Sequence, residues 1–181
     1  MEDAFRIGIG LVGSLVIIGV GIWLGWYVRR KVVVTEAAWR AFVVPRALQF
    51  APHRGAFWWH PGLGASPRVV GVVNGANFAV ELAGWKEIDS TRVTAAVQPL
   101  GSPPPKTSIV EPDQLNGEAA KAWTKLHQLR PDVGIRLALP GGHPMVWVGW
   151  KGIERDPDVL DAAIALAATV ARHPPAAATL S

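Results

Sequence analysis

Residues 7–28 read IGIGLVGSLVIIGVGIWLGWYV, an apolar run of 22 residues without a charged side chain. At 1.5 Å rise per residue, a helix of this length would be about 33 Å long, which matches the roughly 30 Å hydrocarbon core of a bilayer. Twelve of the 22 residues are Ile, Leu or Val, which insert most readily into lipid. The sequence therefore predicts a transmembrane helix over 7–28, preceded by a short outer tail over 1–6.

The C-terminal boundary of this run carries aromatic and basic residues suited to a membrane interface: Trp23, Trp26, Tyr27, Arg29, Arg30 and Lys31. No small-residue cleavage site follows, so the run differs from a signal peptide. The N-terminal side is acidic and the C-terminal side basic. By the positive-inside rule we expect the N-terminus outside and the remainder of the chain in the cytoplasm, on the inner membrane. An inverted anchor with an exported domain is the alternative.

Small residues form a stripe along the expected helix. At 100° per residue, the members of the stripe fall within about 80° of one another: Gly10, Ser14, Ile17, Gly21 and Gly25. Small side chains allow the backbone of a second membrane helix to approach closely. The stripe therefore predicts a helix-packing interface with another integral membrane subunit, although glycines also lie off the stripe at Gly8, Gly13 and Gly19.

Positive charge gathers where the chain would leave the bilayer. Residues 29–80 hold seven Lys or Arg and one acid, 7 − 1 = +6, whereas 81–181 hold ten bases and eleven acids, 10 − 11 = −1. Such a segment is attracted to anionic lipid headgroups. The sequence contains no basic helix or other nucleic-acid-binding pattern, so we expect no nucleic-acid partner. Cysteine is absent, which excludes disulfides and thiolate chemistry.

The remaining 150 or so residues suit one globular domain. Val32–Val34 would form a short β-favouring bridge, and Thr35 could cap a helix from Glu36 to Val44. We expect a basic juxtamembrane segment and helix over 29–48, an α+β domain over 49–172 and a flexible tail over 173–181.

Within this domain, Asn74-Gly75 between two alternating segments is a strong hairpin signature. The pattern predicts six strands, over 68–73, 78–82, 91–98, 106–110, 133–139 and 145–150. Two further helices would follow, one from Asp113 or Asn116 to Arg130 and one opening at Asp156-Pro157. The expected fold is α+β, with about three helices and a mostly antiparallel sheet.

Tryptophan is unusually frequent, at positions 23, 26, 39, 58, 59, 85, 123, 147 and 150. The pair Trp58 and Trp59 lies in a stretch rich in Pro and Gly. In an extended segment, adjacent side chains point to opposite sides, so both cannot enter one core. We therefore expect one of them to contact lipid headgroups or another protein.

Chemistry-bearing motifs are missing from the sequence. It contains no phosphate-binding loop, zinc-protease or serine-hydrolase signature. His53 and His60 lie near each other without further ligands, and Asp156, Asp158 and Asp161 suit a helix N-terminus. The apolar run contains no His, Cys or Met to ligate a pigment. We expect no catalytic, metal or cofactor site owned by this chain, with only peripheral lipid or pigment contacts through Trp23 or Trp26.

The short outer tail, the single helix ending Trp26-Tyr27-Val28-Arg29-Arg30-Lys31 and the β-rich domain resemble the H subunit of type 2 photosynthetic reaction centres in topology. The resemblance covers about 30 residues, and no family motif matches beyond Lys31. It implies a non-catalytic accessory subunit of a photosynthetic or respiratory membrane complex. The alternatives are a membrane-tethered enzyme or ligand-binding domain and a stand-alone membrane-surface binder.

Overall fold

The computed structural model describes residues 2–52, 67–83, 90–97, 108–115, 117–138 and 143–175. For 2–11, Leu24, Val28 and Ala83 only the backbone is described. The expected contact residues Trp58 and Trp59 and the histidine pair lie outside these ranges. The described elements are α1 (Glu2–Val43), η1 (Val44–Arg46), β1 (Gln49–Ala51), β2 (Arg68–Val73), β3 (Ala76–Ala83), β4 (Ser90–Ala96), β5 (Ser108–Ile109), η3 (Pro112–Gln114), α2 (Gly117–Leu129), β6 (Gly134–Ala138), β7 (Met145–Lys151) and α3 (Pro157–Arg172).

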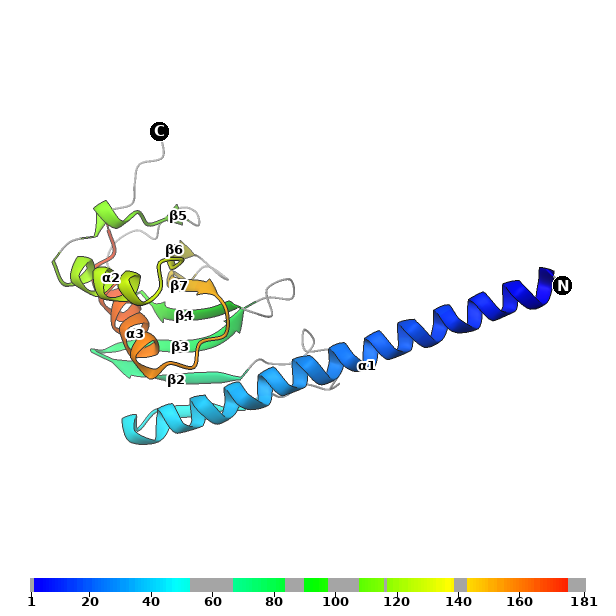
Figure 1. Cartoon of the computed structure of the whole chain (residues 1–181). Helices are drawn as coiled ribbons and strands as arrows, with labels where there is room; N and C mark the ends of the chain where they lie inside the picture. The colour runs from blue at the N-terminus through cyan, green and yellow to red at the C-terminus, as the bar shows by residue number, and fades with distance from the viewer. Residues whose placement is uncertain are drawn as a thin grey trace.

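Helix α1 is one unbroken helix of 42 residues. At 1.5 Å per residue it is about 63 Å long, and its N-terminal part projects from the domain as a straight rod (Figure 1). The expected β-favouring bridge at Val32–Val34 is wrong, because these residues are helical. Three β-branched residues cost only tenths of a kcal/mol each, and extending an existing helix avoids a second nucleation.

Thr35 accordingly does not cap a new helix. Its hydroxyl donates to the carbonyl of Lys31 at 2.8 Å, one turn earlier in α1. The helix ends instead at Pro45 and Arg46 in the short 3-10 turn η1, followed by Ala47 with φ of 52°. The Arg46 guanidinium donates to the carbonyl of Phe42 at 3.1 Å and so satisfies one of the last free carbonyls of α1.

The sheet has seven strands in the order β1-β2-β3-β4-β7-β6-β5, and every ladder in it is antiparallel. All six expected strands are present, although β5 is only two residues long. The hairpin at Asn74-Gly75 is confirmed, with φ of 52° and 81°. The edge strand β1 is an addition that the sequence did not predict, because three residues are too few to show alternation.

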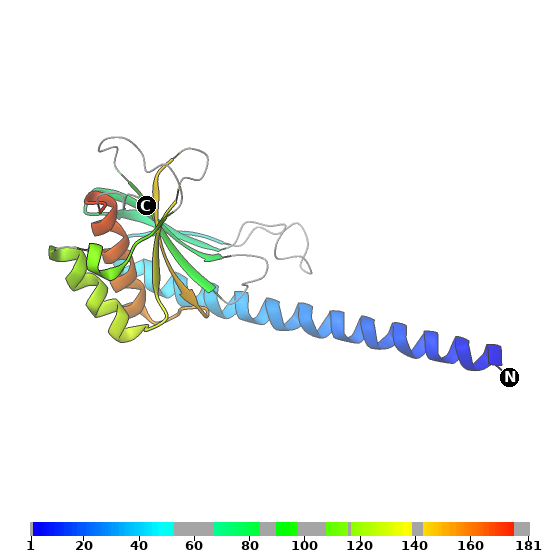
Figure 2. The same ribbon diagram turned by 90° about the horizontal axis from the view of Figure 1, so that it is seen from above.

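Helix α3 packs on one face of the sheet, and α2 packs against α3 on the same side (Figure 2). Most of α3 is buried, and its first turn is capped by Asp156, whose carboxylate accepts from the backbone N–H of Asp158 at 2.9 Å. The end of α1 joins the same core through Trp39, Phe42 and Val43. The α+β class is therefore confirmed, with the last turns of α1 belonging to the domain.

The outer part of α1 contacts nothing else in the described chain. The described large apolar side chains from Val12 to Tyr27 are exposed, Ile17 to 74 %. Among the described residues, α1 is the one helix long and apolar enough to cross a membrane. Exposing a continuous apolar rod to water is unfavourable, and surfaces of this kind are typical of contact with lipid or a partner.

Candidate functional site

The face of the sheet opposite the helices carries a row of charged residues across three strands. The register places Arg68 of β2, Glu81 of β3 and Arg92 of β4 side by side. Each arginine holds one carboxylate oxygen of Glu81, at 2.6 Å from Arg68 and 2.8 Å from Arg92. The carboxylate of Glu81 is largely buried and both bonds are charge-assisted, so these strands share a fixed polar surface.

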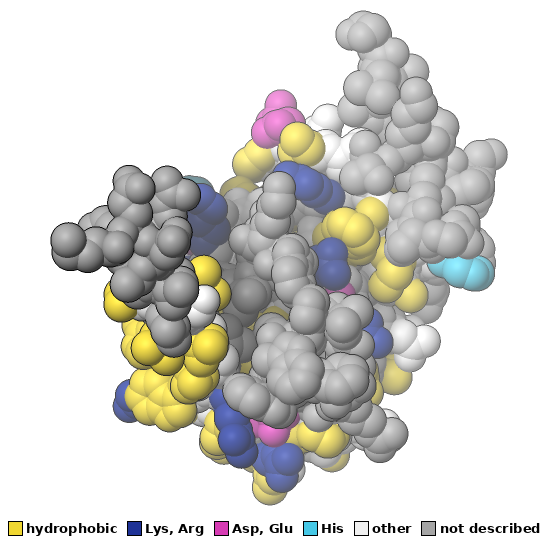
Figure 3. Space-filling model, turned by 90° about the vertical axis from the view of Figure 1, so that its right-hand side faces the viewer, with side chains coloured by type: hydrophobic (Ala, Val, Ile, Leu, Met, Phe, Trp, Pro, Cys, Tyr) yellow, Lys and Arg dark blue, Asp and Glu magenta, His cyan; other side chains and the backbone are white. Residues whose placement is uncertain are grey.

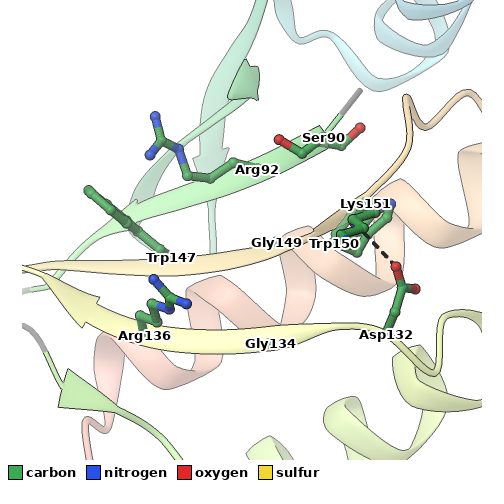
Figure 4. Close-up of a pocket in the computed structure, with 10 residues that line it drawn as sticks. Ser90, Arg92, Asp132, Gly134, Arg136, Trp147, Gly149, Trp150 and Lys151 are labelled. Atoms are coloured by element: carbon green, nitrogen blue, oxygen red, sulfur yellow. Dashed lines mark hydrogen bonds between the residues drawn. The ribbon is translucent and has the colours of Figure 1, made fainter. Parts of the chain in front are cut away.

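An aromatic residue extends this surface toward the next strands. The Arg92 guanidinium lies over the ring of Trp147 on β7, at 4.5 Å from the centroid. Trp147 in turn is the register partner of Arg136 on β6, so the indole stands between two arginines (Figure 4). A guanidinium placed above the face of an aromatic ring is stabilised by a cation–π interaction.

Beside these side chains a cavity lies over the surface of the sheet. Gly149 of β7 and Gly134 of β6 are paired in register next to Arg92, and a Cβ at Gly134 would meet no atom within 4 Å. The result is a cavity of about 380 Å³, bounded on one side by Arg92, Trp147 and Arg136 and on the other by residues at the strand ends (Figure 4). The full lining consists of Ser90, Thr91, Arg92, Asp132, Gly134, Arg136, Trp147, Gly149, Trp150 and Lys151.

Two of the cations lining the cavity are available to a ligand. Arg136 and Lys151 are exposed, and among the described residues neither has an ion-pair partner. The carboxylate of Asp132 accepts from the backbone N–H of Lys151 at 3.1 Å, which holds this acid at the strand end. Three cations against one carboxylate make the lining basic overall.

The cavity opens at the end of the domain from which α1 projects. Helix α1 meets Glu154, just after β7, through Trp39, and reaches Asp161 on α3 only later, through Arg46. The end of β7 therefore lies on the side of the rod. Figure 3 views the molecule from this side and shows several Lys and Arg side chains among the described atoms.

Glu154 is the buried centre that fixes α1 to this end. Its carbonyl accepts from the indole N–H of Trp39 at 2.9 Å, and its carboxylate pairs with Arg130 at 2.6 Å. The same carboxylate accepts from the backbone N–H groups of Arg155 and Asp156, both at 2.9 Å. One residue thus connects α1 to the end of α2 and the start of α3.

A second attachment lies in η1, just past the end of α1. Arg46 forms two hydrogen bonds to the carboxylate of Asp161, at 2.9 and 2.6 Å. The hydrogen bond to Asp161 raises the pKa of Arg46, so the guanidinium remains charged at all physiological pH values. One attachment lies within α1 at Trp39 and the other directly after it at Arg46, so together they fix the direction of α1 relative to the domain.

The predicted membrane-interface residues come together in pairs one turn apart. Trp23 stacks on Tyr27 with centroids 5.6 Å apart, Arg30 lies over Trp26 at 5.5 Å, and the Lys31 ammonium lies over Tyr27 at 4.5 Å. The residues of the small-residue stripe all lie within α1, and their role in helix packing stays a prediction. Its members Ser14, Ile17 and Gly21 are exposed, and Gly21 has no atom within 4 Å of an added Cβ.

Sequence reasoning missed the sheet cavity. The signal was present as alternation, because Arg92, Arg136 and Trp147 occupy the positions of their strands that face away from the helices. The glycine pair could not be recognised, since it depends on the register between β6 and β7. Among the described residues, no group of three or more metal-ligating side chains lies together.

Comparison with protein-family models, curated proteins and solved structures finds no match to this chain.

Proposed function

We propose that this chain is a non-catalytic, single-pass accessory subunit that stabilises or assembles a larger integral membrane complex. The observation that carries the proposal is the exposed apolar surface of α1, continuous with a helix end that is buried in the domain. Such a helix holds the domain at one distance and rotation relative to any membrane partner.

The glycine stripe supports a protein partner rather than lipid alone. Gly21 leaves open space on the surface of α1, and Gly25 follows one turn later. Close backbone approach at such positions provides van der Waals contact between helices, which lipid cannot match in shape. We propose that this stripe packs against a helix of another subunit.

The orientation is proposed from charge. The aromatic pairs and the bases Arg29, Arg30 and Lys31 suit the cytoplasmic headgroup layer, where each base contributes about 1 kcal/mol of attraction to anionic lipids. We therefore place the N-terminus outside and the domain in the cytoplasm, at the inner membrane. The topological resemblance makes photosynthetic and respiratory complexes the first ones to examine.

Extraction in a mild detergent followed by affinity purification and mass spectrometry tests the proposal. We expect integral membrane proteins to co-purify with the chain in a fixed ratio. A monodisperse single chain without companions, obtained under conditions that keep other membrane complexes intact, would contradict it.

A second candidate function is a membrane-tethered ligand-binding domain. The sheet cavity favours this reading, because a volume of about 380 Å³ lies within the range of small-molecule sites, roughly 300–1,000 Å³. The two functions are compatible, since a subunit that stabilises a complex can also bind a ligand.

A further inference from the structure

We infer that the sheet cavity binds the phosphate group of a small phosphate ester from the aqueous phase. The inference rests on the proposed function only for the position of the domain relative to the membrane. The arrangement of the cations around the cavity and the charge that this arrangement requires are the two observations that carry it.

The first observation is the arrangement of the cations. Arg136 and Lys151 lie on the same face of the sheet, two residues on either side of the glycine pair. At about 3.4 Å per residue their Cα atoms are about 14 Å apart along the strands. Both side chains are long enough to reach a group seated over Gly134 and Gly149 from opposite ends.

The second observation is the charge required by such a position. A phosphate monoester carries nearly two negative charges near neutral pH and three terminal oxygens that accept hydrogen bonds. It can therefore engage Arg136 and Lys151 together, whereas a carboxylate carries a single charge. The planar Arg136 guanidinium also matches two phosphate oxygens at once. Trp147 supplies an apolar surface for the organic part of the ester.

The membrane position given by the proposed function adds an argument from distance. The apolar run ends at Val28, and α1 first enters the domain at Thr35, seven residues or about 10 Å later. The headgroup layer on each side is only about 5–8 Å thick. The glycine pair lies further from the membrane than the end of β7 does. A freely diffusing ester therefore reaches the pair more readily than the phosphate of a membrane lipid does.

Isothermal titration calorimetry on the full chain in neutral detergent micelles tests this inference, with glycerol 3-phosphate as the probe. We expect saturable binding, weakened about tenfold or more in the double variant R136Q/K151Q, because two charge-assisted hydrogen-bond donors are lost. R155Q is the matched control, because Arg155 is exposed on the same end of the domain but does not line the cavity. The R155Q variant should bind glycerol 3-phosphate with the affinity of the native chain. Both altered side chains are exposed, so the thermal unfolding midpoint should not change.

Two further probes distinguish the sources of phosphate. Glycerol should not bind, and short-chain dihexanoyl phosphatidylglycerol should bind more weakly than glycerol 3-phosphate. Equal affinity in R136Q/K151Q, an absence of saturable binding, or tighter binding of the lipid would each overturn the inference. If the chain binds the ester but purifies without companions, only the subunit proposal fails. If companions are present and the ester does not bind, only this inference fails.

Discussion

The indole N–H of Trp39 donates a hydrogen bond to the backbone carbonyl of Glu154 at 2.9 Å, between residues 115 positions apart in the chain. Trp39 is fully buried although it lies on the same helix as the exposed apolar rod. This bond joins the rod to the connection between β7 and α3.

Replacing Trp39 by Phe should destabilise the domain by about 1–3 kcal/mol, because the buried carbonyl of Glu154 loses its donor. The thermal unfolding midpoint, followed by near-ultraviolet circular dichroism in micelles, should fall by several degrees. Trp26→Phe is the matched control, since Trp26 is 56 % exposed on the same helix and should shift the midpoint little. Equal midpoints for W39F and the native chain would remove Trp39 as the attachment.

Replacing Glu154 by Gln should cost about 1–3 kcal/mol. One amide oxygen can still accept from the backbone N–H groups of Arg155 and Asp156, but the amide nitrogen then faces the Arg130 guanidinium, donor against donor. A double-mutant cycle with R130Q should give a coupling energy above about 0.5 kcal/mol in denaturant titrations. The exposed Glu118→Gln serves as the control and should lie within about 0.5 kcal/mol of the native chain. Additive effects of E154Q and R130Q would show that the pair is not coupled.

Replacing Gly21 and Gly25 together by Leu should reduce the amount of co-purified partner about fivefold or more, which corresponds to about 1 kcal/mol of lost helix association. An added side chain at Gly21 meets no atom of the chain itself within 4 Å, so a loss would report on a partner. Gly19→Leu is matched in size, has equally open surroundings and lies off the stripe. Loss of companions in G19L to the same extent would contradict the assigned face.

Inserting alanines after Val33 distinguishes the effect of rotating the domain about α1 from the effect of moving it further along the axis of α1. Two residues advance the domain by about 3 Å and rotate it by about 200°, whereas four residues advance it by about 6 Å and rotate it by only about 40° net. Because α1 is continuous and attached at both Trp39 and Arg46, the shorter insertion should disrupt the complex more. The yield of co-purified subunits measures this. A greater loss with four alanines would mean that the distance from the membrane, and not the rotation, is what matters.

Local patterns predicted most of the elements. The turn at Asn74-Gly75 requires positive φ at two positions and so identifies its hairpin from two residues. The α3 helix begins where Asp156 and Pro157 predict it, because capping and the fixed φ of proline are local effects. The short edge strand β1 escaped prediction because only its pairing with β2 makes it a strand.

The sequence by itself determined that one long apolar helix precedes an α+β domain, since apolar run length, periodicity and turn residues act within a few positions of the chain. Only the tertiary structure decided that this helix continues unbroken into the core, because burial of Trp39 and its bond to Glu154 depend on residues more than a hundred positions away. The same holds for the sheet cavity. The register of β4, β7 and β6 brings two glycines beside Arg92, Trp147 and Arg136, and no local pattern records which residues of distant strands become neighbours.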